Sequence, residues 1–159
     1  MKDDAYWMRK ALNLARKAEA VGEVPIGAVI IKDGTIVGRG FNQRESRNDP
    51  SAHAEIIAIR QTSRKLNAWR LTDTTIYVTL EPCPMCMGAI LLARIDRVVF
   101  GCLDPKAGAA GSLYNLADDK RLNHQVELAG GVMKKECSEI LSNFFRKLRS
   151  EKKALREGI

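Results

Sequence analysis

The sequence predicts an α/β fold, a three-layer α/β/α sandwich with a mixed five-stranded sheet. Helix-like and strand-like patterns alternate along the chain in the order helix, strand, strand, helix, strand, helix, strand, strand, helix. Asp33-Gly34 predicts a tight turn between the first two strands, which must then be antiparallel. Helices before the first strand and after the second, third and fifth strands supply the layers that cover the sheet. The order of elements therefore predicts the fold class.

Residues 4–20 form the first predicted helix, because Met8, Leu12 and Ala15 recur at helical spacing. Asp3 or Asp4 is available as its cap, and Gly22 ends it.

Residues 26–31 are too apolar for a strand with a wet face, and residues 35–42 form the return strand of the hairpin. After a polar loop, Asp49-Pro50-Ser51 predicts the start of a second helix that runs to about Lys65. This helix is expected to bury Ile56, Ile57 and Ile59.

The second half of the chain repeats the alternation. Residues 74–80 are rich in β-branched side chains and predict a strand, residues 82–94 a helix, and residues 97–101 another strand. Residues 102–123 are a long loop, which in a small domain is usually functional or disordered. A short strand is expected at 125–128.

A basic helix is predicted at about 133–156, with one apolar stripe and many charges. Residues 134–159 hold eight Lys and Arg against four Glu, and the whole chain carries a net charge of +7. This charge favours a polyanionic partner, although a solvated helix face is the simpler reading of charge alone. The predicted stripe consists of Cys137, Ile140, Leu141, Phe144 and Leu148.

The length of 159 residues suits a single domain, 1–159. No apolar run approaches the length of a membrane-spanning helix, so no membrane partner is expected. The N-terminus lacks the apolar core of a signal peptide, which predicts a cytoplasmic protein.

Three side chains have the spacing of a catalytic zinc site. Cys83 and Cys86 are three residues apart at a predicted helix start, and His53 lies in the predicted first turn of another helix. Three protein ligands leave one position for water, which indicates catalysis rather than a structural site. Glu55 is two residues beyond His53 and can exchange protons with such a water. A redox pair is the alternative for Cys83 and Cys86 alone.

The remaining cysteines have no ligand spacing. Cys137 lies on the apolar stripe and is expected in the core. Cys102 is a candidate core residue at a strand end, although the sequence alone does not exclude it as a fourth ligand.

These residues carry a resemblance to the zinc-dependent nucleobase deaminase superfamily. His53-Ala54-Glu55, a spacer of 26 residues and Pro82-Cys83-Pro84-Met85-Cys86 match its signature. Within it, the chain resembles the bacterial tRNA-specific adenosine deaminases over nearly its whole length. The most discriminating segment is Gly101-Cys102-Leu103-Asp104-Pro105-Lys106-Ala107-Gly108-Ala109-Ala110-Gly111-Ser112.

The resemblance implies a cytidine deaminase-like fold and the hydrolytic deamination of the wobble adenosine of a tRNA to inosine by a zinc-activated hydroxide. Glu55 would be catalytic, and His53, Cys83 and Cys86 would hold one Zn²⁺ per subunit. The partners would be a tRNA anticodon stem-loop and a second copy of the chain in a homodimer. Substrate-binding positions would be Asn42, Ala54, Asp104, Lys106, Phe144, Phe145 and Arg149.

Two rivals remain at this stage. A free-base or nucleotide deaminase acting on guanine or cytosine would share the zinc site but would need no basic surface. A zinc-stabilised nucleic-acid-binding module would need a fourth protein ligand and would have no use for Glu55.

Overall fold

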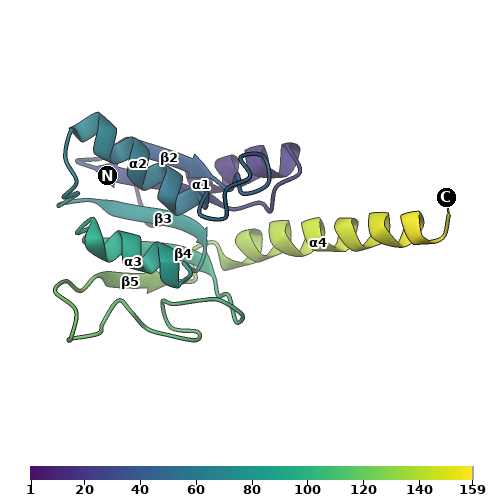
Figure 1. Cartoon of the computed structure of the whole chain (residues 1–159). Helices are drawn as coiled ribbons and strands as arrows, with labels where there is room; N and C mark the ends of the chain where they lie inside the picture. The colour runs from purple at the N-terminus through teal and green to yellow at the C-terminus, as the bar shows by residue number, and fades with distance from the viewer. Residues whose placement is uncertain (159) are drawn as a thin grey trace.

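A computed structural model describes residues 1–158, so that Ile159, the last residue of the predicted domain, lies outside the described residues. The predicted order of elements is present (Figure 1). The helices are α1 (Asp4–Ala20), α2 (Ala54–Leu66), α3 (Pro84–Leu92) and α4 (Lys134–Arg156), and the strands are β1 (Gly27–Lys32), β2 (Thr35–Phe41), β3 (Thr75–Leu80), β4 (Arg97–Cys102) and β5 (Glu127–Gly130).

The sheet is mixed, as predicted, with the strand order β2-β1-β3-β4-β5. The β1 strand pairs antiparallel with both β2 and β3, whereas the β3–β4 and β4–β5 pairs are parallel. The carboxyl ends of β3 and β4 therefore lie at the same edge of the sheet, and the segments that follow them start close together.

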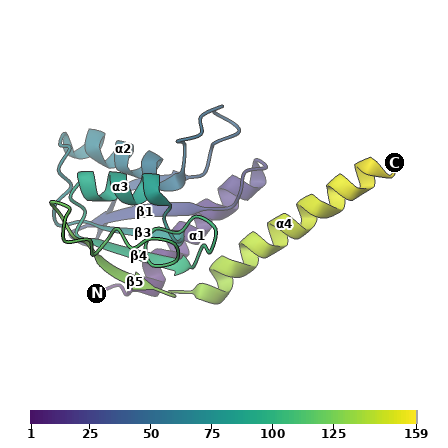
Figure 2. The same ribbon diagram turned by 60° about the horizontal axis from the view of Figure 1, so that its bottom comes forward.

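Helices cover both faces of the sheet, which confirms the three-layer sandwich (Figure 2). The α2 and α3 helices pack on one face, and α1 with the first turns of α4 packs on the other. Successive strand residues point to opposite faces, so each central strand contributes to both cores. Ile30, Val78 and Val98 lie under α2 and α3, whereas Val29, Tyr77 and Val99 lie under α1 and α4.

The second helix starts later than the sequence predicted. The Asp49 carboxylate accepts hydrogen bonds from the backbone N–H of Ser51 at 2.9 Å and from its hydroxyl at 2.7 Å. These local bonds hold residues 49–51 in a turn, because a short polar side chain can compete with the helix for backbone donors. Consequently His53 is the N-cap of α2 and does not lie in its first turn.

The side chains of α2 that face the sheet also differ from the prediction. Ala54, Glu55, Ala58 and Thr62 are buried, whereas Ile56, Ile57 and Ile59 are only half-buried. The small residues face β2, where a Cβ on Gly40 would lie 2.2 Å from the carbonyl oxygen of Ala54. Ile59 still packs against this core as a partly buried residue. The fully buried positions of α2 belong to smaller side chains, because the closely packed β2 strand leaves no room for larger ones.

Two further boundaries moved by about one turn or less. The third helix begins at Pro84 rather than at residue 82, because Cys83 has extended backbone angles and serves as its N-cap. The last strand covers Glu127–Gly130 rather than 125–128, and Gly130 packs directly on the ring of Phe100. Glycine often marks the end of a strand, but Gly130 belongs to this one, because a residue without a side chain is needed against the Phe100 ring.

The C-terminal helix extends well beyond the sheet layers (Figures 1 and 2). Of the predicted apolar stripe only Cys137 is buried, while Ile140, Leu141, Phe144 and Leu148 are half-buried. All side chains from residue 149 to 156 are exposed. The helix is therefore anchored through its first turns, and its distal half has no covering layer.

Within residues 1–158, none of the helices combines the length and the apolar character that crossing a bilayer requires.

Candidate metal centre and basic groove

The candidate metal ligands sit at two helix starts that face each other. His53 caps α2 and Cys83 caps α3, both with extended backbone angles, and Cys86 lies in the first turn of α3. Neither side chain makes a capping hydrogen bond to its helix, so both are free to point toward a shared centre. We call His53, Cys83 and Cys86 the metal cluster.

The geometry of the metal cluster fits a tetrahedral ion. The Nδ1 atom of His53 lies 3.6 Å from Sγ of Cys83 and 3.5 Å from Sγ of Cys86, and all ligand atoms lie within 4.8 Å of one another. A tetrahedral zinc ion with bonds of about 2.0–2.3 Å separates neighbouring ligand atoms by about 3.5 Å. The donor set of two sulfurs and one nitrogen is also the type that zinc prefers.

Among residues 1–158, no fourth His, Cys, Asp or Glu joins this cluster. Cys102 is buried in the opposite core with Cys137, where its thiol donates to the carbonyl oxygen of Thr79 at 3.6 Å. The prediction that Cys137 is a core residue is confirmed. With Cys102 on the other face of the sheet, the centre has the three protein ligands of an open site.

Glu55 is a buried carboxylate on which the charges of both His53 and Cys83 act. It lies in the first turn of α2, two residues after His53, and is only 4% exposed. Burial raises the pKa of the Glu55 carboxyl, since a charge is poorly solvated there. A protonatable group with no water-facing surface is suited to exchanging protons with a bound molecule.

The two thiols and the imidazole influence one another strongly in the metal-free protein. A hydrogen bond from Cys86 lowers the pKa of the Cys83 thiol to about 4. The same interaction, with burial, raises the pKa of Cys86, and hydrogen bonding to Cys83 raises the pKa of His53. The Cys83 thiolate is thus available as a ligand near neutral pH, and a cation would draw the second proton from Cys86.

Two buried polar side chains, Glu23 and Asn42, hold the loop that leads into His53. Glu23 accepts hydrogen bonds from the backbone N–H groups of Glu45 and Ser46, at 3.2 and 2.7 Å. Asn42 is also buried, and its amide donates to the carbonyl oxygen of Val24 at 3.2 Å. These bonds fix the loop that leads into His53.

A groove of about 960 Å³ runs between that loop, the loop after β4 and α4. We call it the basic groove, because its lining includes four cations and one carboxylate. No member of the metal cluster lines this groove, and its nearest lining residue in sequence is Leu80, three residues before Cys83. The groove is lined by Val24, Arg44, Leu80, Cys102, Leu103, Asp104, Pro105, Lys106, Ser138, Leu141, Ser142, Phe145, Arg146 and Arg149.

Four of the predicted substrate-binding residues meet in the basic groove: Asp104, Lys106, Phe145 and Arg149. Lys106 and Arg149 are exposed, and Phe145 is 40% exposed. One carboxylate oxygen of Asp104 already accepts the backbone N–H groups of Lys106 and Ala107. The groove thus combines cations with one accessible aromatic ring.

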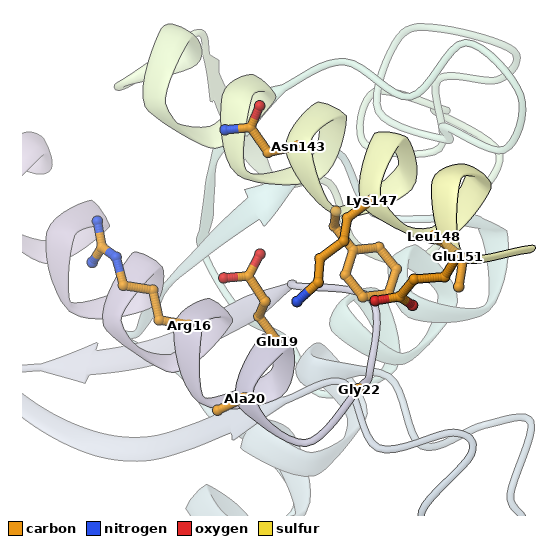
Figure 3. Close-up of a pocket in the computed structure, with 9 residues that line it drawn as sticks. Arg16, Glu19, Ala20, Gly22, Asn143, Lys147, Leu148 and Glu151 are labelled. Carbon is orange, nitrogen blue, oxygen red and sulfur yellow. The ribbon is translucent and has the colours of Figure 1, made fainter. Parts of the chain in front are cut away.

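Phe144 lies on the other side of α4. It lines a separate groove of about 650 Å³ between α1 and α4, where Arg16, Glu19, Lys147 and Glu151 provide charges of both signs (Figure 3). The sequence could not choose between Phe144 and Phe145 because both fit a wide helical stripe. Ala54 is fully buried as the first residue of α2.

Sequence reasoning did not single out Arg44, Glu23 or Glu81. Arg44 stood in a polar loop without a motif. The sequence does contain a sign of Glu23 and Glu81, since each is a charged residue next to an apolar run. A carboxylate buried at such a position needs several hydrogen-bond donors from elsewhere in the chain.

The MafB19-like deaminase family model matches residues 2–149. A tRNA-specific adenosine deaminase of Bacillus subtilis (strain 168) is 49% identical over 159 residues, which is 100% of this chain and 99% of the relative.

Two solved structures are also similar. One comes from work on A-to-I editing by tRNA:A34 deaminases at the wobble position of transfer RNA, with a TM-score of 0.83 and 42% identity over 86% of this chain and 99% of the other. A guanine deaminase from Bacillus subtilis has a TM-score of 0.63 and 40% identity over 70% of this chain and 71% of its own.

Proposed function

The chain belongs to the tRNA-specific adenosine deaminases, and on that premise we propose that it hydrolyses the wobble adenosine of a transfer RNA to inosine. The observation that carries the proposal is the metal cluster with the buried carboxylate of Glu55 two residues after His53. The basic groove, whose lining includes Leu80 three residues before Cys83, adds four cations. The first part supplies the chemistry and the second attracts RNA. A transfer RNA substrate also implies a cytoplasmic protein.

His53, Cys83 and Cys86 would hold one zinc ion per chain, through Nδ1 and the two Sγ atoms. When bound, zinc supplies Lewis acidity that makes water a nucleophile near neutral pH. The two helix starts favour the anionic thiolates, because the unpaired N–H groups of a first turn carry partial positive charge.

Glu55 would move the protons of the reaction. Its carboxylate accepts a proton from the attacking water and donates it to N1 of adenine, which allows addition at C6. It then takes the proton of the hydroxyl group added at C6 and passes it to the exocyclic amine. The C6–N bond breaks, the C6 carbonyl forms, ammonia leaves and inosine remains. Burial excludes competing bulk water from this carboxylate, and such positioned acid–base catalysis contributes about 10²–10⁴-fold to rate.

The basic groove would hold the RNA strand around the target base. Arg44, Lys106, Arg146 and Arg149 can contact phosphates, while Phe145 offers a ring on which a base can stack. A wobble base lies in a single-stranded loop, so its extrusion into a pocket costs less than flipping from a duplex. A free-base deaminase would gain nothing from this groove.

The homodimer would form through the outer faces of α2 and α3. The α3 helix is apolar on all sides, yet Leu92 is 71% exposed and Met85 is 39% exposed. Ile56 and Ile57 of α2 are half-buried and would extend this surface. A second copy of the same chain would cover it. A Leu92→Glu variant should shift the mass measured by light scattering from two chains to one, and a monomeric wild-type protein would contradict the dimer.

The deciding experiment is an inosine assay with zinc-loaded protein. An anticodon stem-loop with a wobble adenosine would be compared with free adenine, guanine, cytosine and cytidine. We expect inosine in the stem-loop and no conversion of the free compounds. Conversion of guanine or cytosine alone would keep the zinc chemistry and refute the RNA substrate.

A further inference from the structure

Glu81 is a buried carboxylate that lies between β3 and the metal ligand Cys83 and is 2% exposed. It is not a member of the metal cluster. In residues 1–158, no Lys, Arg or His forms an ion pair with it. A buried charge without a cation needs several hydrogen-bond donors.

All of those donors come from one loop, residues 103–112, which follows β4. The backbone N–H of Asp104 donates to Oε1 of Glu81 at 2.9 Å, and the N–H groups of Ala110 and Ser112 donate to Oε2 at 3.0 Å each. The Ser112 hydroxyl donates to Oε1 as well. One carboxylate therefore gathers both ends of the loop.

The middle of the loop also packs on the same carboxylate. A Cβ on Gly108 would lie 2.3 Å from Cδ of Glu81 and 2.4 Å from each of its oxygens. The φ angle of Gly108 is not positive, so only this close approach requires glycine there. The loop is additionally tied by the N–H of Ala109, which donates to the carbonyl oxygen of Pro82 at 2.8 Å.

This loop carries Asp104 and Lys106 into the basic groove. Both are exposed enough to meet a ligand, whereas Glu81 lies beneath them and has no surface of its own. The position of the two groove residues thus depends on a carboxylate that cannot touch RNA.

We propose that Glu81 is a positioning residue for the substrate: it holds the 103–112 loop so that Lys106 and Asp104 meet the RNA, and thereby sets the affinity for the stem-loop. The proposal rests on the proposed function, since it requires an RNA substrate in the basic groove. It assigns to Glu81 no part in proton transfer or metal binding.

Glu81→Gln is the first test. Glutamine has a single acceptor oxygen and turns an NH₂ group toward donors, so at least two of the four donors lose their acceptor. We expect the KM for the stem-loop, and its Kd by fluorescence anisotropy, to rise about tenfold or more, because unpaired buried donors displace the loop. The kcat and the zinc content should change little, since the metal cluster keeps its ligands.

Gly108→Ala disturbs the same contact from the loop side. We expect it to raise KM in the wild-type background but to add little in a Glu81→Ala background, where the carboxylate that meets the new methyl group is absent. Glu19→Gln, an exposed carboxylate of α1, is the matched control and should leave KM unchanged.

Two outcomes would overturn the proposal. One is an unchanged KM in both Glu81→Gln and Gly108→Ala. The other is a fall in kcat and zinc content with KM unchanged, which would assign Glu81 to the metal pocket. If Glu81→Gln does not fold, Gly108→Ala decides by the same criteria. Wild-type protein that forms no inosine refutes the proposed function itself, whereas active wild-type with indistinguishable variants refutes only the role of Glu81.

Discussion

The metal cluster and the distal half of α4 (residues 149–156) are positioned by different forces. His53 and Cys83 are N-caps whose backbone is fixed by two helices packed on one sheet face, and Cys86 is fully buried. Every side chain of the distal half of α4 is exposed, and no layer covers it. The proposed chemistry thus depends on packing that tolerates little change, whereas the proposed attraction of RNA would depend on charges that salt can screen.

Removing a metal ligand should have the largest effect. Cys83→Ala leaves two ligands of three, so we expect the zinc content to fall from about one ion per chain to near zero and turnover to be lost. Thermal stability should fall too, because bound metal stabilises the folded state. Metal analysis by mass spectrometry, an inosine assay and a melting curve check this. An active variant with full zinc would remove Cys83 from the site.

Glu55→Ala should separate chemistry from binding. We expect turnover to fall by at least about 10²–10⁴-fold, while zinc content and stem-loop affinity stay near wild-type values. Glu55→Gln is the isosteric companion, which avoids a cavity at this buried position. Single-turnover assays and anisotropy titrations measure the two properties. Retained activity in both variants would refute the role of Glu55.

Removing charges from the distal half of α4 tests whether this segment attracts RNA. Lys152 and Lys153 are exposed, so Lys152→Ala with Lys153→Ala should leave the melting temperature unchanged. RNA binding should weaken most at low salt, and the slope of log K against log salt should fall by about 1.5. Titrations at several salt concentrations provide the measurement. An unchanged slope would show that this segment is a solvated face without contact to RNA.

The smallest effect is expected at an ion pair remote from the metal cluster. Asp4 forms an ion pair with Arg97 at 2.8 Å and accepts a hydrogen bond from the Tyr77 hydroxyl at 2.8 Å. The ion pair joins α1 to the start of β4, whereas two of the metal ligands follow the end of β3. Asp4→Asn should cost about 1 kcal/mol, because the pair is partly exposed, and should leave kcat and KM unchanged.

The pH dependence of that cost has a defined sign. Hydrogen bonding to Arg97 holds the pKa of Asp4 below its ordinary value of about 3.9. The stabilisation is therefore present above that ordinary value and disappears as the pH falls through the lower pKa of the folded state. Denaturant titrations at pH 7 and at about pH 3 should show a smaller difference between variant and wild type at the lower pH. An equal difference at both values would contradict the assignment.

Several features of the fold were accessible from local patterns. The bounds of α1 agree with the prediction of residues 4–20, because period and cap signals coincide there. The start of α2 was missed, since the Asp49 side chain competes locally for the donors of Ser51. Its buried face was missed because β2 approaches closely and selects small residues, which no hydrophobic period encodes.

The sequence by itself determined the chemistry: a histidine and two cysteines at metal-ligand spacing, a glutamate beside them and an excess of positive charge. Residue types and short spacings can be read from the sequence without knowledge of the fold. Only the tertiary structure decided that Phe145 and not Phe144 lines the basic groove, and that Glu81 collects donors from residues 104–112. Such contacts join segments more than twenty residues apart, so packing sets them and no local period records them.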